Sequence, residues 1–186
     1  MMKTYISILR GINVSGHNLI KMEVLRQMYT LLGFKNVQSY IQSGNVLFQN
    51  ETSETQNLEK KISKKILKTF HFEVFVLVNE LDEIKEIVSN NPFVNIRNED
   101  ITHLHVTFLS STPLKENLDK VIGQQYVPDE FIIIDKAIYL FCPNGYGNTK
   151  LSNNFFENKL KVSATTRNWK TTNELVSIAE KMENNI

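Results

Sequence analysis

The sequence predicts an α/β (α+β) protein made of two ferredoxin-like-type halves, ordered β-α-β-β-α-β and then β-α-β-β-α-α. Two observations predict this order. Short runs rich in Val, Ile and Phe alternate with longer segments in which apolar residues recur every three or four positions. Asn90-Asn91-Pro92 then breaks the chain near its middle, and similar runs follow it. We expect residues 1–90 to form the first half and residues 91–186 the second, and the two could pack as one unit.

Strands of the first half are expected where apolar residues alternate or run together over a short stretch. These stretches are residues 3–10, 37–41, 46–48 and 73–78. Ser43-Gly44-Asn45 lies between the second and third stretches and has the composition of a tight hairpin connection. The fourth stretch leads into a helix that Asn79 is expected to cap and that runs through Val88.

Helical spacing predicts two further helices in this half. The first, residues 21–32, ends at Gly33, and its expected apolar face comprises Met22, Leu25, Met28, Leu31 and Leu32. The second follows Ser53 and Gln56, which have capping-box spacing. An apolar residue then recurs every four positions over residues 58–70.

The second half begins with a similar order of elements. Its expected strands are residues 103–109, 131–134 and 138–142. Thr112-Pro113 places a cap and a first-turn proline ahead of a helix. Residues 150–160 form another helix, and a last one is capped by Thr171 with Glu174 three residues on. Residues 165–169 are expected to connect these last two helices, so this half echoes the first imperfectly.

Length and composition are those of an ordinary globular protein, with 186 residues, 41% of them hydrophobic and 22% charged. A net charge of +1 gives no global attraction to nucleic acid or membrane, so a basic function would have to be local. No apolar run approaches the roughly 20 residues needed to cross a bilayer, and Arg10 ends the first run before signal-peptide length. The single cysteine, Cys142, cannot form an internal disulfide. We therefore expect a cytoplasmic protein without a membrane partner.

The first candidate site is the loop from Arg10 to Lys21, between an expected strand and an expected helix. Gly11 and Gly16 allow close approach of the backbone, and a helix start offers N–H groups and a favourable dipole to an anion. Arg10, His17 and Lys21 could add positive charge. The plain alternative is a flexible loop whose arginine is tied to a neighbouring carboxylate.

A second loop between a strand and a helix, residues 144–150, offers the same chemistry through Tyr146 and Lys150. It is neither a Walker loop nor a dinucleotide fingerprint, because Lys150 stands where the latter needs its third glycine. A turn followed by a helix cap is the plain alternative for this loop.

The segment Thr165-Thr166-Arg167-Asn168-Trp169 is the third candidate. Arg167 can make two-pronged hydrogen bonds to phosphate or carboxylate, and the threonines can donate as well. Trp169 could stack on a ring, but a lone Trp ahead of a capped helix is more often a core anchor.

Other features carry weaker signals. His103 and His105 share one face of an expected strand, as a metal pair would, but no third ligand follows at a recognisable spacing. Five lysines make one flank of the helix at residues 60–68 basic, which suits either a phosphate backbone or simple solvation. No Ser-His-Asp order or Gly-x-Ser-x-Gly elbow is present, and no general base stands out.

Four motifs together resemble a bacterial family known only as domain of unknown function 1697. They are residues 9–14, residues 40–46, residues 150–153 and residues 165–169. The resemblance covers nearly the whole chain and implies an α/β fold with ferredoxin-like parts and no established activity. Family members usually carry Gly-Gly-Lys where this chain has Ser15-Gly16-His17, which weakens any role for positive charge at His17 at neutral pH. The resemblance assigns no catalytic residue.

We therefore expect a protein that binds a phosphorylated or otherwise anionic small ligand where these segments converge. The expected ligand-binding residues are Arg10, Asn13, Lys21, Ser43, Asn45, Tyr146, Lys150, Thr166, Arg167, Asn168 and Trp169. One alternative is a nucleic-acid-binding module that uses the lysine-rich helix at residues 60–68, and another is a non-enzymatic protein-interaction domain. No metal site is expected, and the sequence leaves catalytic residues, cofactors and oligomeric state unknown.

Overall fold

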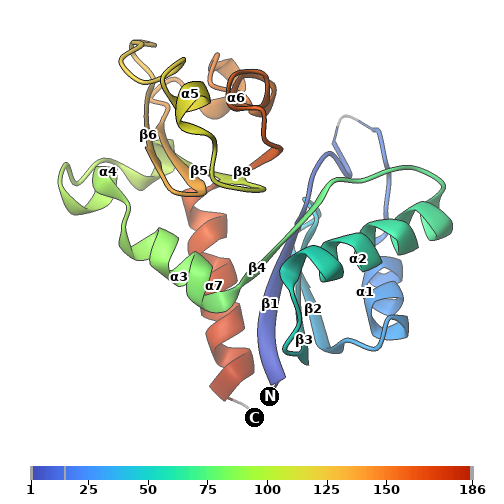
Figure 1. The fold of residues 1–186 in the computed structure, drawn as a ribbon. Helices are drawn as coiled ribbons and strands as arrows, with labels where there is room; N and C mark the ends of the chain where they lie inside the picture. The colour runs from blue at the N-terminus through green and yellow to red at the C-terminus, as the bar shows by residue number, and fades with distance from the viewer. Residues whose placement is uncertain (1, 15, 185–186) are drawn as a thin grey trace. The chain divides into compact units, whose positions relative to one another are not determined.

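Two compact units make up the chain in the computed structural model, which describes residues 2–14 and 16–184 (Figure 1). The first unit comprises residues 1–85 and 174–186, and the second comprises residues 86–173. Each contains a four-stranded antiparallel sheet packed with helices, so the predicted α+β class with two ferredoxin-like halves is confirmed. The division of the chain at residue 90 stays a prediction.

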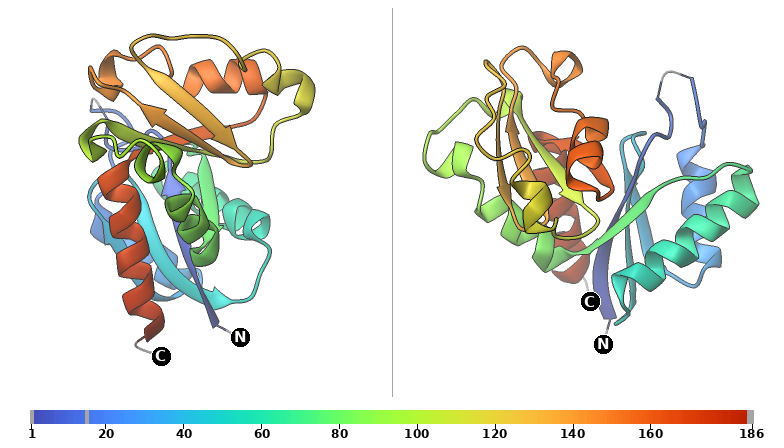
Figure 2. Two further views of the ribbon diagram at one scale, coloured as in Figure 1. Left: turned by 90° about the vertical axis from the view of Figure 1, so that its left-hand side faces the viewer. Right: turned by 45° about the horizontal axis from the view of Figure 1, so that its top comes forward.

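The first unit has the predicted order β-α-β-β-α-β. Its elements are β1 (Met2–Leu9), α1 (Met22–Leu31), β2 (Lys35–Tyr40), β3 (Asn45–Glu51), α2 (Thr55–Phe70) and β4 (Val76–Glu80). The strands lie in the order β2-β3-β1-β4, and α1 and α2 cover the same face of the sheet (Figures 1 and 2). The loop before α1 and the turn between β2 and β3 are therefore brought near the end of β1.

Aromatic rings fill the core between this sheet and its helices. Phe48 stacks on Phe34 with ring centroids 4.3 Å apart and on Tyr5 at 5.6 Å. Tyr29 is fully buried, and its hydroxyl lies 2.9 Å from the Ser7 hydroxyl, which supplies the hydrogen bond that a buried phenol needs. Burial raises the pKa of Tyr29 well above its ordinary value.

The remaining elements belong to the second unit, except that α3 and α7 each have residues in both units. These remaining elements are α3 (Leu81–Ser89), α4 (Pro92–Asn95), η1 (Ile101–His103), β5 (Leu104–Leu109), α5 (Lys115–Leu118), β6 (Glu130–Ile134), β7 (Ala137–Phe141), η2 (Tyr146–Asn148), α6 (Asn153–Leu160), β8 (Ala164–Asn168) and α7 (Trp169–Asn184). The strand order is β6-β7-β5-β8. None of the helices among the described residues combines the length and apolar character that crossing a membrane requires.

Strand β8 corrects the predicted order of the second half. Residues 165–169 were expected to connect two helices, but Ala164–Asn168 pairs with β5 and completes β-α-β-β-α-β before α7. The sequence of β8 is mostly polar, so it lacks the apolar alternation that marks a half-buried strand. Its threonines are nevertheless well suited to a pleated surface, because β-branched side chains pack against cross-strand neighbours.

Helix details in the first half differ from the predictions in three places. The Ser53 hydroxyl donates to the Glu51 carbonyl, so the expected capping box is wrong and α2 begins after Glu54 without a side-chain cap. Asn79 lies inside β4, and the Glu83 carboxylate instead accepts from the Glu80 N–H at the start of α3. Leu31 is 78% exposed, because the buried face of α1 contains Tyr29 and not Leu31.

Helix starts in the second half also differ. The helix expected after Thr112-Pro113 is the single turn α5, which has Leu114 at its N-cap. Helix α6 begins at Asn153, capped by the Ser152 hydroxyl, rather than at residue 150. Helix α7 begins at Trp169, and its cap is the Asn168 side chain, which accepts from the Thr171 N–H at 2.7 Å. The sequence predicts polar caps at the starts of these helices, but the observed caps lie a few residues away from the predicted positions.

Candidate functional site

The loop between β1 and α1, residues 10–21, is held in place by two asparagine side chains. The Asn13 amide donates to the Ile20 carbonyl at 3.0 Å and to the Gln42 carbonyl at 2.9 Å, and it accepts from the Ile20 N–H at 2.8 Å. The Asn18 amide donates to the Gly11 carbonyl at 3.0 Å. Both asparagines have positive φ, which this residue type tolerates. Asn13 therefore fixes the loop to the turn between β2 and β3.

That turn, residues 41–44, packs against the end of β1 through Gly44. The Leu9 N–H donates to the Gly44 carbonyl at 2.8 Å, and Gly44 has a φ of 79°. Asn45 follows it, is fully buried, and donates to the Tyr40 carbonyl and to the Ser43 hydroxyl, at 3.2 and 3.0 Å. Asn13, Ser43 and Asn45 therefore belong to one hydrogen-bonded corner of the first unit, and their role in binding a ligand stays a prediction.

Basic residues lie along the loop of this corner. Arg10 is half-buried at the end of β1, and His17 and Lys21 are exposed farther along the loop. Residues 10–21 contain no Asp or Glu, and Lys21 occupies the N-cap of α1 without a side-chain cap of its own. Ser15, part of the departure from the family pattern, lies outside the described residues. The loop can therefore present cations and the N-terminal end of α1 to an anion.

A hydroxyl network lies on one face of the second sheet. Thr166 on β8 is its centre: its hydroxyl oxygen lies 2.6 Å from that of Thr107 on β5, and it accepts from the Tyr146 hydroxyl at 3.0 Å. The Thr166 hydroxyl itself donates to the side-chain amide oxygen (Oδ1) of Asn153 at 2.7 Å. The network joins β5, β8, η2 and the start of α6, and it fixes the loop that contains Tyr146.

His105 lies beneath that loop. Its ring stacks on the Tyr146 ring with centroids 4.9 Å apart and an interplanar angle of 25°. The His105 Nδ1 atom is buried and makes no hydrogen bond to any described residue. Burial lowers the pKa of His105, so the neutral imidazole is favoured, and its unprotonated nitrogen is a potential acceptor.

This lowered pKa predicts how stability depends on pH. The unfolded chain binds a proton at His105 near the ordinary pKa of 6.5, whereas the folded chain resists it. The contribution of His105 is therefore present above about pH 6.5 and is lost as pH falls below it. In urea titrations between about pH 7.5 and about pH 5.5, the wild type should lose more stability than His105→Phe, which keeps the ring but cannot titrate. Parallel losses in the two proteins would contradict this.

Arg167 points to the opposite face of β8 from Thr166, because successive side chains of a strand alternate. Its guanidinium donates to the Thr165 hydroxyl at 3.2 Å and to the Thr166 carbonyl at 2.9 Å. Burial lowers the pKa of Arg167 to about 10, so the group still carries its charge at neutral pH. Trp169 is 5% exposed, as expected of a core anchor, whereas Lys150 is exposed.

The structure thus divides the predicted site residues between the two units. Arg10, Asn13, Lys21, Ser43 and Asn45 belong to the first unit, and the others belong to the second. Within the second unit, Tyr146 and Thr166 are in contact, while Arg167 lies on the other face of the sheet. The convergence of Arg10 with Arg167 stays a prediction.

Sequence reasoning missed the partners of Thr166. Thr107 and Asn153 were not singled out, and His105 was considered only as half of a metal pair. The spacing of His105 and Thr107 places both side chains on one face of β5. This spacing indicates a polar cluster only once Thr166 is known to lie opposite Thr107. Among residues 2–14 and 16–184, no cluster of three or more His, Cys, Asp or Glu side chains could hold a metal ion.

Comparison with known proteins places this architecture among uncharacterised ones. A family model described as "Protein of unknown function (DUF1697)" matches residues 2–139. The chain is also similar to the solved structure of the conserved bacterial protein SP0830 from Streptococcus pneumoniae, with 25% sequence identity and a TM-score of 0.72. That similarity covers 96% of this chain and 99% of the other. No curated protein matches the sequence.

Proposed function

This chain belongs to the DUF1697 family of proteins of unknown function, and from that premise we propose that it binds a small anionic ligand, with phosphorylated compounds as the first class. The observation that carries the proposal is the corner of the first unit formed by residues 10–21 and 41–45. There, Arg10 and Lys21 lie at the two ends of a loop whose sequence contains no Asp or Glu, and the Asn13 side chain bonds to Ile20 and to Gln42 of the neighbouring turn.

The hydrogen bonds of Asn13 to Ile20 and Gln42 support binding, because a preorganised site loses little conformational entropy when a ligand arrives. Asn13 and Asn45 contribute by positioning the backbone and Ser43, whereas Arg10 and Lys21 are the proposed direct contacts. The proposal gives His17 no charge-neutralising role. No residue is assigned a catalytic role.

The test is thermal unfolding with inorganic phosphate, pyrophosphate, sugar phosphates and nucleotides. A ligand at a hundred times its dissociation constant adds about 2.7 kcal/mol to the free energy of unfolding. For a chain of this size we expect the melting temperature to rise by roughly 5–10 °C. Arg10→Ala and Lys21→Ala should remove most of the rise while leaving the unliganded melting temperature within a few degrees of the wild type.

The matched control is Lys35→Ala, which removes an exposed lysine at the start of β2. It should keep the full ligand-dependent rise. A rise that survives both Arg10→Ala and Lys21→Ala would move the binding site away from this corner. The absence of a rise with every anion of the panel would refute the proposal.

Residues of the second unit are proposed as a further set of ligand contacts. Tyr146, Lys150 and Thr166 border the loop over His105, and Arg167, Asn168 and Trp169 continue along β8 into α7. Since Asn168 caps α7 and Trp169 is buried, Lys150→Ala is the informative variant, because its side chain is exposed. A ligand-dependent rise that is lost only in this variant would place an anion site within the second unit.

Nucleic-acid binding remains the second candidate, because Lys60, Lys64 and Lys68 recur every four residues of α2 and are all exposed. Lys61 is less available, since it donates to the Leu32 carbonyl at 2.8 Å and covers the Phe34 ring. An oligonucleotide in the same panel separates the two functions. Binding that weakens steeply with salt and is lost in Lys64→Glu would favour nucleic acid.

A further inference from the structure

A cavity of about 610 Å³ lies within the second unit. Its lining residues come from one continuous stretch, residues 112–135, which contains α5, the loop after it and the edge strand β6. None of the described residues proposed above as ligand contacts lines it. Cavities of this volume are typical of sites for small molecules, which combine a mostly apolar lining with a few polar groups. The cavity is therefore a candidate for a second ligand site with its own chemistry.

The lining is mostly apolar and includes two aromatic rings. Phe131 and Ile133 contribute the face of β6 that packs on the core of the unit. The Tyr126 ring lies 6.0 Å from the Phe131 ring, measured between centroids, and packs edge-on against Phe155 at 5.2 Å. Further apolar lining residues are Leu118, Ile122, Val127 and Ile132. A ligand with an aromatic or aliphatic group would bury that group against this surface.

Hydrogen bonds shape the loop between α5 and β6. The Gln124 side-chain amide donates to the Lys120 carbonyl at 2.7 Å, and the Tyr126 hydroxyl donates to the Gln124 side-chain oxygen. The Asp129 N–H donates to the Tyr126 carbonyl at 3.0 Å. These bonds set the positions of Tyr126 and Asp129 in the cavity wall, so binding requires little further ordering of the loop.

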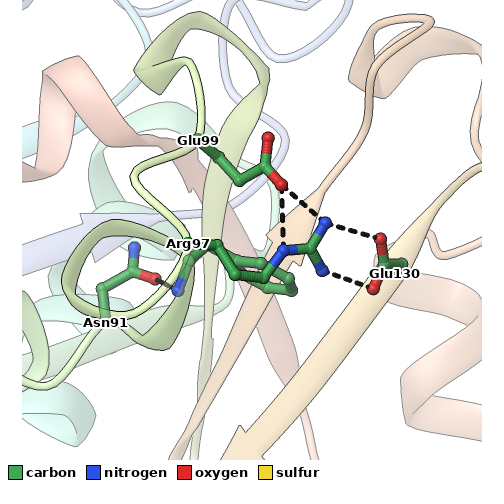
Figure 3. A network of polar contacts seen from close by, with 5 residues as sticks. Asn91, Arg97, Glu99 and Glu130 are labelled. Atoms are coloured by element: carbon green, nitrogen blue, oxygen red, sulfur yellow. Dashed lines mark hydrogen bonds and ion pairs between the residues drawn. The ribbon is translucent and has the colours of Figure 1, made fainter.

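The charged residues that line the cavity are all acidic. They are Asp129, Glu130 and Asp135, and no lysine or arginine of the described chain is among the lining residues. Arg97 donates to both carboxylate oxygens of Glu130, at 2.6 and 3.0 Å, and so balances the charge of that residue (Figure 3). Glu130 is therefore not counted among the ligand contacts.

Asp129 and Asp135 differ from Glu130 in this respect. Among residues 2–14 and 16–184, no cationic side chain forms an ion pair with either carboxylate. The Thr149 hydroxyl donates to Asp129 Oδ2 at 2.6 Å, which orients that carboxylate but brings no charge to it. Asp135 is exposed in the turn between β6 and β7. The cavity therefore combines an aromatic, apolar lining with two carboxylates that no cation balances.

From this combination we propose that the cavity binds a small organic cation, an ammonium group joined to an aromatic or branched aliphatic group. The apolar part packs against Tyr126, Phe131 and Ile133. The ammonium group lies toward the carboxylates of Asp129 and Asp135, which attract it, and the faces of the aromatic rings attract it as well.

The charge of the lining separates this ligand class from others. An anion would meet the carboxylates of Asp129 and Asp135 and no lysine or arginine of the lining, and like charges repel strongly where water is excluded. A neutral apolar molecule uses the aromatic surface but gains nothing from the two carboxylates. A small cation uses both features. It is opposite in charge to the ligand proposed for the first unit, so the two sites are independent of each other.

The experiment is an amide NMR titration of the full chain with phenethylamine, which joins an ammonium group to a phenyl ring. Phenethyl alcohol and hydrocinnamate are the matched probes, because they have the same ring with a neutral or an anionic end. Phenethylamine should shift the signals of residues 118–135 and bind roughly tenfold more tightly than either matched probe. An absence of shifts in these residues, or equal affinity for the three probes, overturns the proposal.

Two double variants test the role of the carboxylates. Asp129→Asn with Asp135→Asn should lower the affinity for phenethylamine roughly tenfold. Asparagine keeps an oxygen that can accept from Thr149, and it tolerates the φ of 49° at residue 135, so the fold should be retained. The matched control, Glu116→Gln with Asp119→Asn, removes the same charge from exposed residues of this stretch that do not line the cavity, and it should leave the affinity unchanged. Unchanged affinity in the first variant, or an equal loss in the control, contradicts the proposal.

Discussion

Replacing Gly44 with alanine is expected to lower the free energy of unfolding by about 2–5 kcal/mol. Two costs add at this position. A φ of 79° is disfavoured for any residue with a Cβ atom. That Cβ would also lie 2.8 Å from the Leu9 Cβ and 2.9 Å from the Ile12 Cδ1, both in the buried core. The measurement is urea denaturation of the purified variant, monitored by circular dichroism.

The control for this prediction is Gly11→Ala in the neighbouring loop. Gly11 has a similar φ of 72°, but an added Cβ there would meet no atom within 4 Å. It should therefore show the backbone cost alone, about 1–2 kcal/mol. Equal destabilisation of the two variants would show that close packing against β1 contributes nothing. Because Gly44 seats the turn against β1, its variant should also weaken anion binding at the corner of the first unit.

The first unit was the more predictable half, because its apolar pattern and its architecture agree. The helix with Leu58, Ile62 and Ile66 buries the residues that its spacing selects, and the apolar run of β1 is buried on both faces. Even so, Leu31 was assigned to the wrong face of α1. Leu31 is related to the nearest buried residue of α1, Met28, by a small rotation about the helix axis. The spacing of apolar residues does not show on which side of this limit the buried face ends.

Strand β8 shows the limit of sequence reasoning in the second unit. Its residues carry hydroxyl, guanidinium and amide groups, and single-chain patterns assign such residues to loops. They form a strand because Thr107 and Thr166 lie opposite each other and share hydrogen bonds. The register that brings them together is set by contacts distant in sequence, so no local pattern could indicate it.

The candidate site was predicted in part for a similar reason. Asn13 and Asn45 were selected as ligand contacts, and the structure shows that their amides hold loops together. An asparagine that binds a ligand and one that fixes a turn have the same side chain and the same preference for positive φ or strand ends. Only their partners distinguish the two roles, and the binding role stays a prediction.

Replacing Thr166 with valine is expected to lower the free energy of unfolding by about 2–4 kcal/mol. Valine has nearly the same shape but places a methyl group where threonine has its hydroxyl, so the hydrogen bonds of that hydroxyl are lost. The Tyr146 hydroxyl would then lose its acceptor, and the side-chain amide oxygen of Asn153 its donor. Each partly buried group left unsatisfied costs about 1–3 kcal/mol. Thr107→Val should cost less, because the bonds of Thr166 to Tyr146 and Asn153 remain.

A second consequence of Thr166→Val concerns His105. Tyr146 covers the His105 ring, and its hydroxyl bond to Thr166 helps to hold it there. If Tyr146 moves away, water reaches the imidazole and the desolvation that lowers the His105 pKa is relieved. The His105 pKa should therefore rise toward its ordinary value, as measured by an NMR titration of the ring protons. A destabilised variant with an unchanged His105 pKa would show that Tyr146 keeps its place by stacking alone.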